Sequence, residues 1–152
     1  AARDVGGAFA IEAPKGWSER DEWSSLVPTY AAFERDRSVS VTFYPAGNPL
    51  FKGVKAYLAH RLAAKGDAKK PRRLSDLKTA SGPAQLWTHD YPASRSGVHG
   101  EQSAPQTTRE LFAVLDRGGE FWVLWVHAPL PVFSDAEKAF RAAAASFKIL
   151  GR

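Results

Sequence analysis

The side chains best suited to chemistry are four histidines, His60, His89, His99 and His127. None stands at a metal-ligand spacing such as HExxH or a zinc-ribbon pattern, and the chain has no cysteine to supply a thiolate. We expect His89 near the end of a strand and His99 in the long loop that follows. If the two met beside a carboxylate, they could hold a metal in a hydrolase or another metal-dependent enzyme. The competing interpretation is that they are independent surface histidines.

Other catalytic patterns are missing from the sequence. No G-x-S-x-G nucleophile elbow occurs, and neither Gly6-Gly7 nor Gly118-Gly119 leads into the Lys-Ser/Thr of a phosphate-binding loop. The acidic pair Asp135/Glu137 stands at a predicted helix start, where acids suit the helix dipole. We therefore predict a protein that is not an enzyme, with no catalytic residues, no cofactor and no metal.

Positive charge is concentrated in residues 52–78. This segment holds nine Lys or Arg against Asp67 and Asp76, whereas the whole chain carries a formal charge of +5. Such a patch could meet an acidic protein surface, anionic lipid or a nucleic-acid backbone, or it could be only a solvated helix end and turn. Base stacking would need an aromatic ring beside the cations, but the aromatic residue of this segment, Tyr57, falls on the predicted apolar stripe. Nucleic acid is therefore the least favoured partner.

Aromatic residues supply a second candidate surface. Trp122 and Trp125 belong to a predicted core strand and point to opposite faces, whereas Trp23 and Trp87 are less constrained and could line a groove for a peptide or a sugar. Partly buried sheet edges would be the simpler explanation. The candidate binding residues are Lys69, Lys70, Arg72, Arg73, Trp23, Trp87 and His99.

Composition describes an ordinary globular chain. It has 152 residues, 44% of them hydrophobic and 24% charged, which suits a single domain over residues 1–152. The absence of cysteine excludes disulfides but is compatible with several compartments. The sequence begins Ala-Ala-Arg-Asp without a methionine, so we expect a processed product whose N-terminal segment has been removed.

The stretch Phe121–Val126 organises the predicted fold. It is a run of large apolar residues between Gly118-Gly119 and Pro129, which predicts a strand covered on both faces. Gly118-Gly119 predicts a hairpin with a strand at 107–117. Further strands are expected at 8–13, 29–34, 39–43, 72–81 and 83–91, with a long loop at 93–106. Residues 18–26 suggest a short helical turn or an ordered loop.

Two helices complete the prediction. One is amphipathic and should start at Asn48-Pro49 and end near Gly66. The other should start at the capping box Ser134–Glu137 and carry an alanine-rich apolar stripe. Strands joined by hairpins, with two helices and one doubly covered strand, predict an α+β fold in which an antiparallel sheet is sandwiched between helices.

Short motifs at both ends of the chain carry a family resemblance. Near the start stands Phe9-Ala10-Ile11-Glu12-Ala13-Pro14-Lys15-Gly16-Trp17, and near the end stand Phe121-Trp122-Val123-Leu124, Ala128-Pro129, Phe133, Phe140 and Ser146-Phe147-Lys148-Ile149. This pattern resembles the PsbP/Mog1-like superfamily, including small bacterial proteins of the DUF1795 or DcrB kind. The resemblance implies an antiparallel sheet between helices and an accessory or binding role. Members of the family share no set of catalytic residues, so the resemblance carries none over to this chain.

The expected function is accordingly that of an accessory or binding protein with an unidentified protein partner. We expect it to lie outside the cytoplasm, in the periplasm or at the outer surface, tethered as a lipoprotein through a removed N-terminal segment. A cytoplasmic chaperone or adaptor for secretion effectors, of the DUF1795 kind, is the alternative. The metal-dependent enzyme or hydrolase is the third hypothesis. Neither the ligand nor the oligomeric state can be derived from the sequence.

Overall fold

A computed structural model describes residues 2–22, 27–63, 69–93 and 104–151. The helices are α1 (Val54–Arg61), the short 3-10 helix η1 (Leu130–Val132) and α2 (Phe133–Ser146). The strands are β1 (Arg3–Val5), β2 (Phe9–Ile11), β3 (Ser18–Glu22), β4 (Thr29–Glu34), β5 (Arg37–Tyr44), β6 (Arg72–Thr79), β7 (Gly82–Ala93), β8 (Gln106–Arg117), β9 (Glu120–Pro129) and β10 (Lys148–Ile149). No helix among the described residues is long and apolar enough to cross a membrane.

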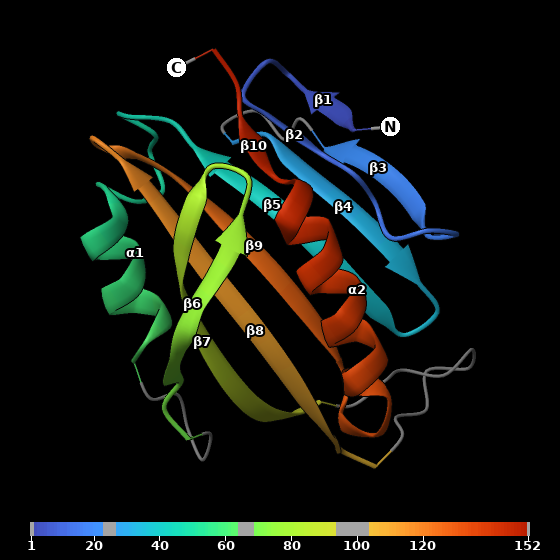
Figure 1. The fold of residues 1–152 in the computed structure, drawn as a ribbon. Coiled ribbons are helices and arrows are strands. Elements are labelled where there is room, and N and C mark those ends of the chain that lie inside the picture. The colour runs from blue at the N-terminus through green and yellow to red at the C-terminus, as the bar shows by residue number, and fades with distance from the viewer. Residues whose placement is uncertain (1, 23–26, 64–68, 94–103, 152) are drawn as a thin grey trace.

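A seven-stranded sheet forms the centre of the molecule, in the order β3-β4-β5-β9-β8-β7-β6 (Figure 1). All its neighbouring strands pair antiparallel. The predicted central strand is confirmed, because β9 lies between β5 and β8 and Phe121 to Leu124 are buried. Gly118 and Gly119 turn the β8–β9 hairpin with φ values of 66° and 100°, a backbone conformation that glycine adopts without steric cost.

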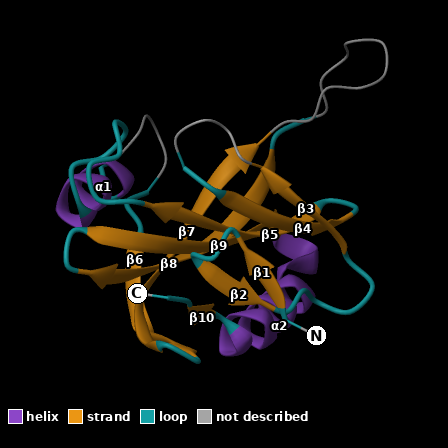
Figure 2. Cartoon of the chain, turned by 90° about the horizontal axis from the view of Figure 1, so that it is seen from above, coloured by secondary structure: helices purple, strands orange, loops and turns teal. Residues whose placement is uncertain are grey.

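Helix α2 covers one face of this sheet and α1 covers part of the other, so the predicted α+β sandwich is confirmed (Figure 2). On the α2 side, the alternate residues Trp122, Leu124 and Val126 of β9 join Phe140 and Phe147 in the larger core. The small antiparallel sheet β1-β2-β10 packs into the same core through Phe9, whose ring lies 5.6 Å from that of Phe147. The predicted opposite placement of Trp122 and Trp125 is also confirmed.

On the α1 side, a smaller cluster is built from aromatic rings. Tyr57 of α1 is buried against Phe121 and Tyr44, at ring distances of 5.5 Å for both. Helix α1 spans only eight residues and therefore covers only part of this face. Farther along the same face, the strands carry polar and half-buried side chains.

Three local expectations were wrong, and the first concerns the segment 18–26. Residues 18–22 form the edge strand β3, which pairs with β4; Glu19 accepts from Tyr30 at 2.9 Å and Asp21 from Arg3 at 3.4 Å. Residues 23–26 of the expected segment lie outside the described residues. Charged edge strands of this kind also discourage pairing with another chain.

The two helix starts differ from expectation for separate reasons. Asn48 does not cap α1; its side-chain oxygen accepts from the backbone N–H of Leu50 and Phe51 in a local turn, and α1 begins only after Gly53 (φ 87°). The expected end of this helix near Gly66 lies outside the described residues. Helix α2 begins at buried Phe133, directly after η1, so Ser134 already lies within the first turn and caps nothing.

Candidate functional site

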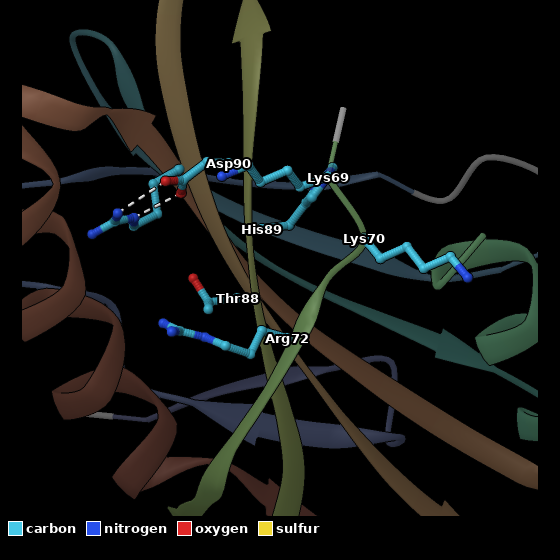
Figure 3. Close-up of a pocket in the computed structure, with 7 residues that line it drawn as sticks. Lys69, Lys70, Arg72, Thr88, His89 and Asp90 are labelled. Atoms are coloured by element: carbon cyan, nitrogen blue, oxygen red, sulfur yellow. Dashed lines mark hydrogen bonds and ion pairs between the residues drawn. The ribbon is translucent and has the colours of Figure 1, made fainter. Parts of the chain in front are cut away.

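A pocket of about 320 Å³ lies on the α2 side of the sheet, beside the strands β6, β7 and β8. The pairing of the strands sets residues of this pocket opposite one another. Arg72 of β6 pairs with Thr88 of β7, and Asp90 of β7 pairs with Arg109 of β8. Alternate residues of a strand face one side, so these four side chains share a face. Figure 3 shows the residues that line the pocket, which are Lys69, Lys70, Arg72, Thr88, His89, Asp90 and Arg109.

Among the described residues that line the pocket, Asp90 supplies the one carboxylate, and it is paired with Arg109. Asp90 accepts two hydrogen bonds from Arg109, at 2.7 Å from Nε and 2.9 Å from Nη2. These bonds lower the pKa of Asp90 and raise the pKa of Arg109, and in both cases they outweigh the opposing effect of burial. The guanidinium of Arg109 also lies over the ring of Phe133, 5.9 Å from its centroid, so it is held from two sides.

The other cations of the pocket have no such partner. Among the described residues, no carboxylate lies within ion-pair distance of Lys69, Lys70 or Arg72. Figure 3 shows Lys69 directed toward Asp90 and Lys70 directed away from it, while the Arg72 and Thr88 side chains lie near each other. Leaving His89 aside, the described residues that line the pocket carry four cations and one carboxylate, a net charge of +3, with Lys70 directed away from Asp90 (Figure 3). This described lining therefore carries an excess of positive charge, which suits an anion.

A second polar cluster lies on the opposite face, where Glu110 of β8 is only 7% exposed. Its carboxylate accepts from Arg61 at 2.5 Å, from the Trp125 indole at 2.6 Å and, with a donating tautomer, from His89 Nδ1 at 2.9 Å. Arg61 is the last residue of α1, and its guanidinium lies over the Phe112 ring at 4.5 Å. Through Arg61 the cluster attaches α1 to the sheet, while His89 and Trp125 join Glu110 from the neighbouring strands β7 and β9.

His127 lies next to this cluster, and among the described residues no side-chain hydrogen bond joins it to Glu110. Its ring packs on Trp125 with centroids 4.6 Å apart. Burial lowers the pKa of His127, although the negative charge of Glu110 opposes the shift. No group of three or more His, Cys, Asp or Glu in the described part of the chain could hold a metal ion.

The structure brings together three of the predicted site residues, Lys69, Lys70 and Arg72. Arg73 points to the other face, where its guanidinium lies 5.1 Å from the Trp87 ring and bonds to Asp76 at 2.6 Å. Trp87 is 8% exposed and stacked on Phe112, so its ring offers no groove surface.

Trp23 and His99 lie outside the described residues, as does most of the 93–106 loop. The proposed encounter of His89 with His99 therefore has only one described member, and that member is bonded to Glu110. The basic residues of 52–78 do not act as one surface, since Arg61 and Arg73 each have a carboxylate partner.

Asp90 and Arg109, which complete the pocket, were not predicted from the sequence. The signal that could have revealed them is the antiparallel register of β7 with β8, which sets the two residues opposite each other. The register pairs residues that are far apart in the sequence, so a search for local motifs does not detect it.

Solved structures share this arrangement of strands and helices over nearly the whole chain. A protein from Bacteroides thetaiotaomicron superposes with a TM-score of 0.60 at 10% identity, covering 98% of this chain and 47% of that one. The solution structure of cyanobacterial PsbP (CyanoP) from Synechocystis sp. PCC 6803 gives 0.52 at 15% identity, covering 96% of this chain and 89% of CyanoP. A mutant form of the protein Mog1 gives 0.50 at 16% identity, with coverage of 99% and 96%.

The chain has the PsbP/Mog1-like fold. The fold predicted from the terminal motifs is thereby confirmed. This PsbP/Mog1-like chain spans about half the length of the Bacteroides protein. No protein-family model and no curated protein sequence matches it. At these identities the likeness concerns the fold alone, so function must be argued from the pocket.

Proposed function

We propose that this PsbP/Mog1-like protein is a non-enzymatic accessory protein that binds an acidic group of a protein partner at the basic pocket. The observation that supports the proposal is the uncompensated charge of Lys69, Lys70 and Arg72, none of which has a carboxylate partner among the described residues. Like charges held around one cavity repel each other, and an incoming anion relieves that repulsion. Asp90 supplies only part of that relief, because both its oxygens accept hydrogen bonds from Arg109.

Charge recognition also fits the described surface better than capture of an apolar segment. The large apolar side chains most exposed in the structure are Phe33, Leu50 and Leu130, which belong to three different segments. Phe33 is partly covered by the guanidinium of Arg20, 5.6 Å from its ring centroid. The adaptor alternative, which needs an exposed apolar groove, has less support from the described residues than a charged contact.

The test is binding of a fluorescein-labelled hexaglutamate peptide, followed by fluorescence anisotropy over a salt titration. We expect Lys69→Ala and Arg72→Ala each to weaken binding about 3- to 10-fold, equivalent to about 0.7–1.4 kcal/mol. Affinity should also fall as salt is raised. Lys78→Ala is the matched control, because Lys78 is an exposed cation on the same strand but does not line the pocket. Equal losses in the three variants would refute the proposal.

The compartment forms a separate part of the proposal. We propose that the protein acts outside the cytoplasm, tethered through a removed N-terminal segment, as its resemblance to PsbP-like lipoproteins implies. Sequencing the start of the gene tests this, because a signal peptide followed by a cysteine would support it. A gene that encodes neither would favour the cytoplasmic adaptor.

A further inference from the structure

We propose that the basic pocket binds a phosphate monoester or inorganic phosphate, a doubly charged oxyanion, in preference to a carboxylate. The inference rests on the proposed function only in that both need the cations of the pocket to be free to meet an anion. It differs in the chemical group recognised, which can be tested separately.

The first argument is the number of charges. Apart from His89, the described lining residues are four cations and one carboxylate, a net charge of +3. A carboxylate brings one negative charge, whereas a phosphate monoester brings about 1.5 to 2 at neutral pH. The dianion therefore compensates about twice as much of the positive charge on the pocket lining as a carboxylate does. Attraction at such short range grows with the product of the charges, so the dianion gains more.

The second argument is the arrangement of the donors around the cavity. Lys69 precedes β6, Arg72 begins β6 and Arg109 comes from β8, so the donors approach the cavity from different segments. A carboxylate has two oxygens in one plane, whereas a phosphate monoester has three acceptor oxygens in a tetrahedral array. The larger array can accept from several segments at once. The guanidinium of Arg72 also presents the planar fork that binds phosphate through two parallel hydrogen bonds.

The third argument concerns Asp90, the group that should repel an anion. Its two hydrogen bonds to Arg109 direct both carboxylate oxygens toward that guanidinium. The pair is also partly solvated, since the side chains of Arg109 and Asp90 are 40% and 41% exposed. The negative charge of Asp90 is thus largely cancelled where it stands, and Asp90 fixes Arg109 in place beside the cavity. Lys69 and Arg72, which also line the space, remain unpaired among the described residues.

The experiment is isothermal titration calorimetry with inorganic phosphate at neutral pH and constant ionic strength, with acetate as the comparison anion. We expect phosphate to bind at least about tenfold more tightly than acetate. Arg72→Ala should weaken phosphate binding about tenfold or more. Arg72→Lys, which keeps the charge but loses the fork, should weaken it by an intermediate factor. Lys78→Ala should bind as the wild type does. Equal affinities for phosphate and acetate, or an Arg72→Ala variant that binds normally, would overturn the inference.

Two further arms identify the source of the phosphate group. Vesicles of phosphatidylcholine carrying phosphatidic acid present a monoester headgroup, and vesicles carrying phosphatidylglycerol present a diester with one charge. Binding to the phosphatidic acid vesicles alone supports a lipid source, while binding of free phosphate without vesicle binding supports a soluble one. Equal binding to both vesicle types would contradict recognition of a monoester.

The hexaglutamate assay separates this inference from the proposed function. Hexaglutamate binding without any phosphate binding refutes the phosphate inference and leaves the proposed function in place. Phosphate binding without hexaglutamate binding supports the inference and refutes a protein carboxylate as the group recognised. Thermal unfolding with and without phosphate confirms that each variant is folded, since a bound ligand raises the unfolding temperature.

Discussion

Replacing Glu110 with alanine tests whether the buried carboxylate holds α1 on the sheet. The change leaves the Arg61 guanidinium, the Trp125 indole N–H and the His89 ring without their common acceptor. Breaking a buried ion pair from one side costs about 3–5 kcal/mol. The Arg61 side chain is 25% exposed, so water solvates part of its charge and the low end of that range applies. We therefore expect a loss of about 3 kcal/mol in the free energy of unfolding.

The assay is urea denaturation followed by circular dichroism, with thermal unfolding as a second readout. For a chain of this size, about 3 kcal/mol corresponds to a fall of about 6–12 °C in unfolding temperature. Glu110→Gln retains one acceptor oxygen and should cost about 1–2 kcal/mol. Glu137→Ala is the matched control, because its pair with Arg141 is exposed and spaced i,i+4, and we expect a change within about 0.5 kcal/mol.

A double variant separates the ion pair from simple loss of packing. The double variant Arg61→Met/Glu110→Leu removes both charges and keeps apolar volume. Its loss in the free energy of unfolding should therefore be smaller than the sum of the losses of Arg61→Met and Glu110→Leu made singly. The reasoning is refuted if Glu110→Ala costs less than about 1 kcal/mol, or if the two single changes simply add. Hydrogen exchange adds a local readout, since α1 amides should lose protection before those of β9.

The remaining predictions concern single positions. The pKa of His127 is lowered in the folded state, so the unfolded state binds a proton at this residue more readily. The free energy of unfolding should therefore fall as pH drops below about 6.5. In urea titrations, His127→Gln should lose less of that free energy on acidification than the wild type does. Trp122 is fully buried and its indole N–H has no acceptor among the described residues, so Trp122→Phe should cost only about 1 kcal/mol by denaturant unfolding, against about 3–5 kcal/mol for Trp122→Ala. Gly119 has a φ of 100°, so Gly119→Ala should lose about 1 kcal/mol or more, whereas Gly118→Asn, at a φ of 66°, should unfold at nearly the wild-type urea concentration.

The elements that local pattern determines could be predicted from the sequence. The run Phe121–Val126 has no polar alternation, which is incompatible with a wet face, and β9 is indeed the central strand. The diglycine turn identifies the β8–β9 hairpin for a similar reason. The start of α1 could not be predicted, because a good capping residue can also close a turn, as Asn48 does.

Which residues line the pocket depends in part on how the strands pair, and local sequence patterns do not reveal that pairing. Lys69, Lys70 and Arg72 could be identified from a run of charge, but Arg72 and its neighbour Arg73 point to opposite faces of β6. A shift of one residue reverses that choice, and only the pairing with β7 decides it. Arg109 is 19 residues from its partner Asp90, and their meeting requires the register across the β7–β8 connection.

The strand order has a consequence for how the protein is made. The sheet consists of two meanders, β3-β4-β5 and β6-β7-β8-β9, which meet only where β5 pairs with β9. During synthesis the first meander leaves the ribosome with its β5 edge unpaired until α1, β6, β7, β8 and finally β9 have been translated. One edge of β2 pairs with β1 early, but its other edge stays unpaired until β10, the last strand among the described residues, has been translated. The order of translation thus leaves an open sheet edge on the nascent chain, the kind of edge that a chaperone or a neighbouring nascent chain can occupy before β9 arrives.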